Sequence, residues 1–264
     1  MTVAVTYKIL QIGCGNMGKA IAGAIAGELA DSELLIIDPR AQDSFSNENI
    51  KLCSSVSEIG DFQANIVIFA VKPQNIKEVM AEFANWVNKD AIIISILAGT
   101  TVSIFKETFP QNKIVRVMPN LGAIISKSVN LAYSEDGDVS FKEKIGALLK
   151  SFGCTVWLNE ESQLHAGTAV SGSGPAYYYL FLKIYAKYLE NAGYEAEAAQ
   201  EIAIETAEAA SQTAKGQNLD QLIKNVTSKG GTTEAALNVL DDDLERLINE
   251  SLDAAASRSV ELSS

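Results

Sequence analysis

A glycine-rich segment near the start of the chain has the residue types and the spacing to hold a phosphate group. It reads Gly13-Cys14-Gly15-Asn16-Met17-Gly18 and matches the pattern G-x-G-x-x-G. It directly follows a β-branched run and opens an amphipathic helix, the context in which this pattern is informative. The first glycine permits a tight turn, the second lets a pyrophosphate approach the backbone, and the helix start supplies N–H groups. The segment predicts a dinucleotide site formed by Gly13, Gly15, Asn16, Met17 and Gly18.

Two charged residues after the second predicted strand bear on which dinucleotide binds. Asp38 stands about 20 residues beyond the last glycine, where an acidic side chain accepts hydrogen bonds from the ribose hydroxyls of NADH. Arg40 follows it and is suited to the 2′-phosphate of NADPH. The sequence therefore predicts NADPH or NADH as cofactor, with Asp38 giving NADH a slight advantage.

Three further strand ends are expected beside the cofactor. They are the turns FAVKPQ at residues 69–74, SILAGT at 95–100 and MPN at 118–120. Ligands of open α/β sheets bind at the carboxyl ends of the strands. We therefore expect the following residues to lie near the dinucleotide: Val71, Lys72, Pro73, Ala98, Gly99 and Asn120.

The elements that must position these residues form a βαβ series. Near-continuous apolar runs at 8–12, 34–37, 66–71, 91–97 and 114–118 are typical of parallel strands buried on both faces. Apolar residues between the runs recur at helical spacing, and two more strands are predicted at 129–133 and 155–158. The pattern predicts an α/β Rossmann-type domain with a doubly wound, mostly parallel sheet.

The pattern changes near residue 160. From Glu160 onward there is no strand-like run, only alanine-rich helical segments such as EAEAAQEIAIETAEAASQTAK. We expect a dinucleotide-binding Rossmann domain at residues 1–159 and an all-α domain at 160–264.

The composition excludes several classes of partner. The net charge is −12 and no cluster of Lys and Arg is present, which argues against nucleic acid and anionic membranes as partners.

The three cysteines, Cys14, Cys53 and Cys154, are widely spaced, so we expect reduced thiols in a cytoplasmic protein and no metal site. We expect no signal peptide, and no apolar run reaches the length of a membrane-spanning helix.

Six segments together resemble one family. They are, in chain order, GCGNMGKAI, FAVKPQ, ILAGT, MPN, SGSGPAY and VTSKGGTTEAAL. Together they extend over nearly the whole chain and look like the segments of pyrroline-5-carboxylate reductase. SGSGPAY combined with GGTT is specific to that family, whereas the first loop is shared by Rossmann proteins generally. The family reduces 1-pyrroline-5-carboxylate to proline with NADPH or NADH, at the last step of proline biosynthesis. The resemblance implies a helical domain that dimerises by interleaving its helices, with larger rings of dimers in some members.

The resemblance also implies a substrate site. It places the substrate between the nicotinamide and residues 228–233, near the partner subunit. Ser228, Gly231, Thr232 and Thr233 match positions that hold the substrate, and Thr233 matches the threonine proposed to hydrogen-bond the imine nitrogen. The N–H groups of a Gly-Gly-Thr-Thr helix start suit a carboxylate without any Lys or Arg. The other residues expected to bind substrate are Gly230, Ser171 and Gly172.

Departures from the family pattern leave other functions open. Leu121 and Gly122 replace the usual Thr-Pro after MPN, Lys229 replaces a proline, and His165 replaces an acidic residue. A related NAD(P)-dependent imine reductase or dehydrogenase, acting on another small carboxylate, is one alternative. A nucleotide-binding protein without catalysis is another, although the two retained threonines argue against it. We interpret His165, the only histidine, as structural.

Overall fold

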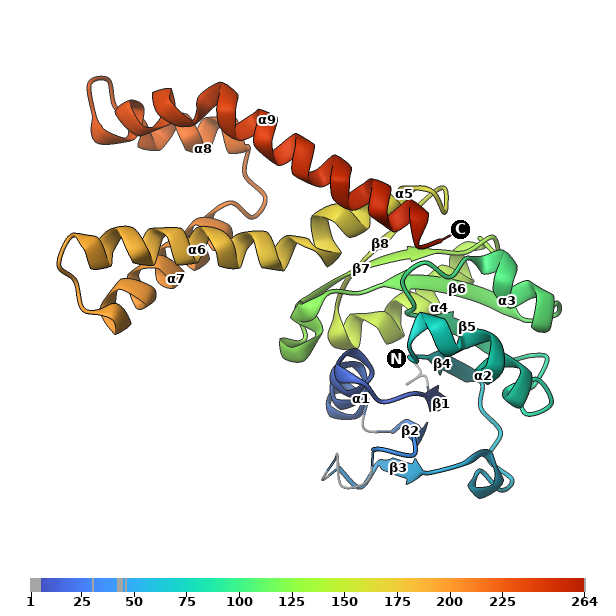
Figure 1. Cartoon of the computed structure of the whole chain (residues 1–264). Helices are drawn as coiled ribbons and strands as arrows, with labels where there is room; N and C mark the ends of the chain where they lie inside the picture. Colours follow the sequence, from blue (N-terminus) through green and yellow to red (C-terminus); the bar gives the residue numbers. More distant parts are fainter. Residues whose placement is uncertain (1–5, 30, 42–44, 46, 264) are drawn as a thin grey trace. The chain divides into compact units, whose positions relative to one another are not determined.

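The computed structural model describes residues 6–29, 31–41, 45 and 47–263, and it contains an eight-stranded sheet in the order β3-β2-β1-β4-β5-β6-β7-β8 (Figure 1). The strands are β1 Lys8–Ile12, β2 Glu33–Ile37, β3 Ile50–Cys53, β4 Ile66–Phe69, β5 Ile92–Ser95, β6 Lys113–Met118, β7 Ser128–Tyr133 and β8 Gly153–Trp157. All neighbouring strands pair in parallel except β6 and β7, which are antiparallel. The predicted mostly parallel, Rossmann-type sheet is confirmed.

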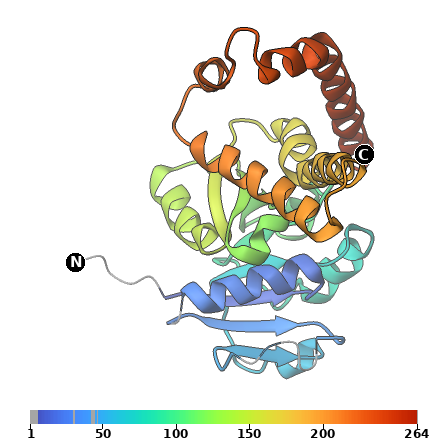
Figure 2. The ribbon, with the colours of Figure 1, turned by 90° about the vertical axis from the view of Figure 1, so that its left-hand side faces the viewer.

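Helices cover both faces of the sheet. Helices α1 (Asn16–Glu28) and α4 (Val139–Leu149) pack on one face, and Figure 2 shows α1 lying along the first strands. Helices α2 (Ile76–Phe83) and α3 (Val102–Thr108) pack on the other face. The central strands are therefore buried on both faces of the sheet. Their side chains must be apolar on each face, which explains the continuous apolar runs. Short helical turns complete this part: η1 Val56–Glu58, η2 Pro73–Asn75, η3 Leu121–Ile125 and η4 Lys150–Phe152.

The edge strand β3 was not predicted. Of its residues, Ile50–Cys53, only Cys53 is buried and Lys51 is exposed, so the strand lacks the continuous apolar pattern of the central strands. Parallel pairing with β2 brings them into the sheet, a non-local contact that the short segment does not reveal by itself.

The C-terminal part is entirely helical, as predicted. It contains α5 (Gln163–Gly167), the π-helical turn η5 (Thr168–Gly172), α6 (Gly174–Asn191), α7 (Ala196–Thr213), α8 (Leu219–Val226) and α9 (Thr232–Glu261). By backbone contacts, residues 1–172 and 255–264 form one compact unit and residues 173–254 form another. Within the second unit α6 and α7 pack on each other and bury Ala199 and Ala203. The described helices include none that is long and apolar enough to cross a membrane.

We predict that Phe105→Ala strongly destabilises the sheet unit. Phe105 is 0% exposed and stacks edge-to-face on Phe69, with ring centroids 5.3 Å apart. Loss of a buried aromatic ring costs about 3–5 kcal/mol of unfolding free energy through transfer and cavity terms. Urea unfolding at one fixed protein concentration measures the loss. Trp86→Ala, at a position 44% exposed, serves as the control and should lose well under half as much; equal losses would contradict the expectation.

Candidate functional site

The glycine loop leaves room for a ligand on one side and none on the other. Gly13 has φ +97°, and a side chain there would meet the Ala70 carbonyl oxygen at 2.6 Å. A side chain at Gly15 would meet nothing within 4 Å. The loop is therefore pressed against the end of β4 while its second glycine faces open space, the arrangement that a pyrophosphate requires.

Hydrogen bonds to residues of β1 and β2 hold the glycine loop against the sheet. Gln11 is 0% exposed, and its Nε2 donates to the carbonyl oxygens of Gly13 at 2.9 Å and Gly18 at 3.0 Å. The Gly13 N–H donates to the Ile37 carbonyl oxygen at 2.8 Å. The sequence did not identify Gln11, because a glutamine inside an apolar strand has no motif around it that indicates this role.

The start of α1 is open to an anion. The residue before the helix, Gly15, makes no side-chain cap, and the first turn contains no acidic residue. Uncapped N–H groups and the positive end of the helix dipole favour a phosphate. The predicted dinucleotide residues Gly13, Gly15, Asn16, Met17 and Gly18 thus form a loop and helix start that fit a pyrophosphate.

Asp38, directly after β2, is hydrogen-bonded both to the glycine loop and to Arg40. The Cys14 N–H donates to Asp38 Oδ2 at 2.8 Å, and the Arg40 N–H donates to Asp38 Oδ1 at 2.9 Å. Arg40 Nε lies 3.6 Å from Oδ1, with the arginine side chain 80% exposed and the aspartate 7% exposed. The acidic residue predicted to meet ribose is therefore tied to the protein backbone on both oxygens.

The residues expected after β4 and β5 lie at the same end of the sheet as the glycine loop, where the parallel strands terminate. Since β1, β4 and β5 run parallel, their carboxyl ends lie together, and Gly13 packs directly against Ala70 and Val71. Val71, Lys72 and Pro73 form the turn that enters η2, and Pro73 is at its first position. After β5, Ala98 is exposed and Gly99 has φ +75°. The backbone of Leu262 occupies the space where a side chain at Gly99 would stand.

Asn120 connects two of the family segments. Its Oδ1 accepts from the N–H groups of Gly122 at 3.0 Å and Val129 at 3.3 Å, and its Nδ2 donates to the Ser171 carbonyl oxygen at 3.1 Å. The MPN turn therefore lies beside Ser171 and Gly172, which belong to the same compact unit, and a side chain at Gly172 would crowd Met118. The Asn120 amide, predicted to lie near the cofactor, holds these two turns together.

The segment that carries the proposed catalytic threonine belongs to the other unit. Gly230 has φ +71°, its N–H donates to Glu234 Oε2 at 2.7 Å, and the Gly231 N–H donates to the Ser228 carbonyl oxygen at 2.9 Å. No described residue accepts a hydrogen bond from the N–H of Thr232 or Thr233. The donors that remain for an anion are therefore those of the two threonines, at the first positions of α9.

His165 lies in a polar cluster beside α5. Its Nδ1 is 3.0 Å from Ser259 Oγ. Nearby, Glu161 Oε1 accepts from Arg116 Nη1 at 2.9 Å and from the Val102 N–H at 2.9 Å. Burial lowers the pKa of His165 below 6.5, and the Arg116 charge lowers it further against the opposite effect of Glu161. These contacts connect α5, α3 and the last residues of the chain, which is consistent with a structural role for His165.

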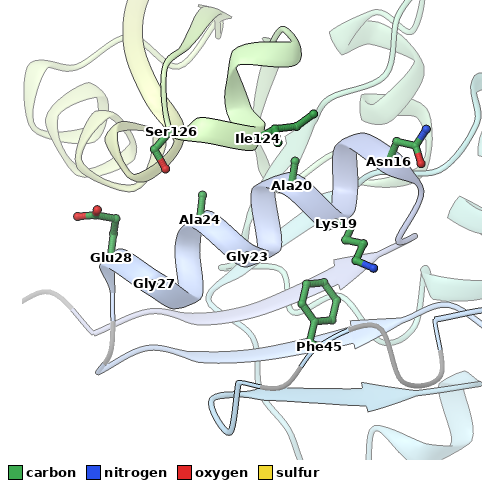
Figure 3. Close-up of a pocket in the computed structure, with 10 residues that line it drawn as sticks. All are labelled: Asn16, Lys19, Ala20, Gly23, Ala24, Gly27, Glu28, Phe45, Ile124 and Ser126. Atoms are coloured by element: carbon green, nitrogen blue, oxygen red, sulfur yellow. The ribbon is translucent and has the colours of Figure 1, made fainter.

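A separate pocket of about 670 Å³ runs along the outer face of α1 (Figure 3). Its lining residues are Asn16, Lys19, Ala20, Gly23, Ala24, Gly27, Glu28, Phe45, Ile124 and Ser126. The three glycines of the G-x-G-x-x-G pattern are not among them. Asn16 is shared with the predicted dinucleotide site, which stays a prediction for the strand ends.

Comparison with known sequences identifies the family. A family model described as pyrroline-5-carboxylate reductase dimerisation matches residues 161–262, and one described as NADP oxidoreductase, coenzyme F420-dependent, matches residues 8–99. A pyrroline-5-carboxylate reductase of Haemophilus influenzae is 34% identical over 262 residues, covering 96% of this chain and 97% of that protein. This chain belongs to the pyrroline-5-carboxylate reductase family. A relative in Pseudomonas aeruginosa, with the same name, is 32% identical over 97% of each chain.

Solved structures of the family have the same fold. A pyrroline-5-carboxylate reductase from Coxiella burnetii superimposes with a TM-score of 0.89 at 30% identity, over 98% of this chain and 100% of that one. The Plasmodium falciparum pyrroline carboxylate reductase, solved with NADP bound, gives 0.84 at 26% identity over 98% of each chain. The NADP bound in that structure is one of the two cofactors that the sequence of this chain predicts.

We predict that Gly15→Ala weakens dinucleotide binding at least about tenfold without loss of stability. The added methyl group meets no protein atom within 4 Å and the backbone, at φ −67°, accepts alanine, so the methyl group obstructs only the ligand. Calorimetric titration with NADPH and NADH, together with a melting curve, tests this. Gly23→Ala in the same helix also meets nothing within 4 Å and should bind normally. Unchanged affinity in Gly15→Ala would contradict the assigned site.

We predict that the pKa of His165, measured by proton NMR, lies below 6.5. Since the folded-state pKa is depressed, the neutral ring contributes its full stability above pH 6.5, and that contribution is lost as pH falls through the folded pKa. Compared with His165→Asn, the wild type should therefore lose more stability between pH 7.5 and pH 5.5. A single histidine makes the NMR assignment unambiguous. A measured pKa at or above 6.5, or parallel pH profiles, would contradict this.

Proposed function

We propose that this protein is a pyrroline-5-carboxylate reductase that transfers a hydride from NADPH or NADH to the imine carbon of 1-pyrroline-5-carboxylate and yields L-proline. The observation that carries the proposal is the family match over nearly the full chain, with SGSGPAY and GGTT both retained. The nicotinamide supplies the hydride when bound. The chain's own residues bind and orient the reactants.

The phosphate end of the cofactor is held by backbone donors. The loop of Gly13 to Gly18, braced by Gln11 and by Asp38, presents N–H groups at the start of α1. Ala98 and Gly99, at the carboxyl end of β5, are the residues that would hold the nicotinamide part of the dinucleotide. Position and orientation of the reactants are the protein's main contribution to the rate.

The substrate carboxylate is held in the same way at the start of α9. The N–H groups of Thr232 and Thr233 and the Ser228 hydroxyl are suited to bind it, with Gly230 and Gly231 allowing close approach. Glu234 already accepts the Gly230 N–H, so that donor is not free for the substrate. The Thr233 hydroxyl orients the imine nitrogen, which binds protonated or takes its proton from water. Ser171 and Gly172 complete the proposed substrate residues.

We further propose that the protein works as a homodimer, with a larger ring of dimers as the next level of assembly. Residues 161–262 match the dimerisation model. In the second unit, α6 exposes large apolar side chains that a monomer would leave in water, among them Tyr178, Leu180 and Tyr188, the last 76% exposed. A second copy of the chain covers this surface. A cytoplasmic location stays a prediction.

We predict that Thr233→Ala lowers turnover at least tenfold, roughly a 1.4 kcal/mol effect, because an oriented hydroxyl is lost. NADPH and NADH oxidation with pyrroline-5-carboxylate is the measurement. Thr233→Ser should retain most activity, and Thr213→Ala is the control, since Thr213 Oγ1 bonds only backbone carbonyls within α7. An unchanged rate in Thr233→Ala would remove the residue from the mechanism. Absence of wild-type turnover with either dinucleotide, despite binding, would overturn the proposed reaction.

A further inference from the structure

We propose that Asn120 is a positioning residue for the imine substrate, which it serves by fastening the π-helical turn η5 to the turn after β6, and that its side chain does not bind the dinucleotide. The inference rests on the proposed reaction, for which Ser171 and Gly172 are proposed substrate residues. It differs from the expectation drawn from the sequence, which places Asn120 near the cofactor because the residue follows a strand of the sheet.

The side chain of Asn120 is almost fully occupied within the protein. A side-chain amide offers two lone pairs on its oxygen and two hydrogens on its nitrogen. Both lone pairs are used, because Oδ1 accepts from the N–H groups of Gly122 at 3.0 Å and Val129 at 3.3 Å. Nδ2 donates one hydrogen to the Ser171 carbonyl oxygen at 3.1 Å. The amide therefore has no acceptor left for the carboxamide of a nicotinamide, and a single N–H remains.

The backbone around Asn120 is fixed as well. Its N–H donates to Ser128 Oγ at 3.0 Å, and its carbonyl oxygen accepts the Ala123 N–H at 3.0 Å. Ser128 is 1% exposed and belongs to β7, the strand next to β6 in the sheet. A side chain at Gly122 would meet the Lys127 carbonyl oxygen at 2.5 Å, so the turn between the two strands is closely packed. This turn is a fixed support for whatever the Asn120 amide holds.

The Ser171 carbonyl oxygen, which Asn120 holds, lacks its ordinary helical donor. Ser171 lies in η5 (Thr168–Gly172), a π-helical turn that follows α5 in the chain. In an α-helix its carbonyl oxygen would accept the N–H of the residue four positions on, but that residue is Pro175, which has no N–H. The Asn120 amide supplies a donor in its place. Turns of the π type are rare and occur frequently at functional sites.

The bond from Asn120 gives η5 a defined orientation. A side chain at Gly172 would crowd Met118 Cε at 3.1 Å, so the turn packs closely on the end of β6. An apolar contact of this kind sets a distance without a direction, whereas a hydrogen bond sets both. Ser171 Oγ donates to the Gly167 carbonyl oxygen at 2.9 Å, which orients the hydroxyl within the same turn. Asn120 therefore determines how Ser171 and Gly172 are presented to a substrate.

Kinetics and dinucleotide titration of the full-length Asn120→Asp variant test the inference. The carboxylate keeps an oxygen for Gly122 and Val129 but places its other oxygen against the Ser171 carbonyl oxygen, so only the fastening bond is lost. The KM for pyrroline-5-carboxylate should rise about tenfold, the effect of a hydrogen bond lost with its acceptor left unpaired. The dissociation constant for NADPH, measured without imine, should stay within about twofold of the wild-type value.

Asn112→Asp is the matched control. Asn112 directly precedes β6, whereas Asn120 follows it, and Asn112 is 4% exposed. Its Nδ2 donates to the carbonyl oxygens of Asn88 at 2.8 Å and Ala91 at 2.9 Å. The control loses the same kind of bond at the opposite end of the strand, so its melting temperature should fall while its KM stays unchanged. An equal rise of KM in both variants would indicate general loss of structure and overturns the inference.

Ser128→Ala repeats the test if Asn120→Asp does not fold. It removes only the hydroxyl that accepts the Asn120 N–H, so KM should rise about threefold with NADPH binding unchanged. A weakened dissociation constant for NADPH in either variant, or an unchanged KM in both, overturns the inference. A wild type that shows no imine turnover overturns the proposed reaction instead, and the titration then still decides whether Asn120 binds the dinucleotide.

Discussion

The contact between the glycine loop and the end of β4 is the constraint on which the site depends. At Gly13 no side chain fits, because the Ala70 carbonyl oxygen occupies its place, and the backbone adopts a φ that favours glycine. The contact lies between β1 and β4, where the strand order of the sheet reverses. Ligands of open α/β sheets bind at such a point. Close approach of these two strand ends therefore fixes the shape of the loop at the place where we propose that the cofactor binds.

In the proposed function, an acidic protein binds its anionic ligands through backbone N–H groups. With a net charge of −12, long-range attraction does not favour a dinucleotide or a carboxylate. Two helix starts, at Asn16 and at Thr232, supply N–H groups instead, and both follow glycines that allow close approach. In each case protein acceptors already take part of the donor set: Asp38 binds the Cys14 N–H and Glu234 binds the Gly230 N–H. These carboxylates fix the two loops, and they determine which backbone N–H groups remain available for an anionic ligand.

Much of the fold follows from local pattern. The central strands β1, β2, β4, β5 and β6 coincide with continuous apolar runs, because a strand buried on both faces must be apolar throughout. The short edge strand β3 escaped prediction, since half-exposed residues give no such run. Ser171 and Gly172, the first two residues of the SGSG segment, end a π-helical turn whose start at Thr168 no sequence spacing indicates.

The sequence by itself determined the order of strand, glycine loop and helix, the change to an all-helical second part and the family, because these depend on spacing within short segments. Only the tertiary structure decided what individual side chains do. Gln11 braces the loop, Asp38 binds the Cys14 N–H, Asn120 holds Ser171, and Leu262 lies against Gly99. Apart from the Gln11 brace, these contacts join residues that are distant in the chain. They form only when packing brings the partners within hydrogen-bonding or van der Waals distance, and a one-dimensional pattern carries no record of that distance.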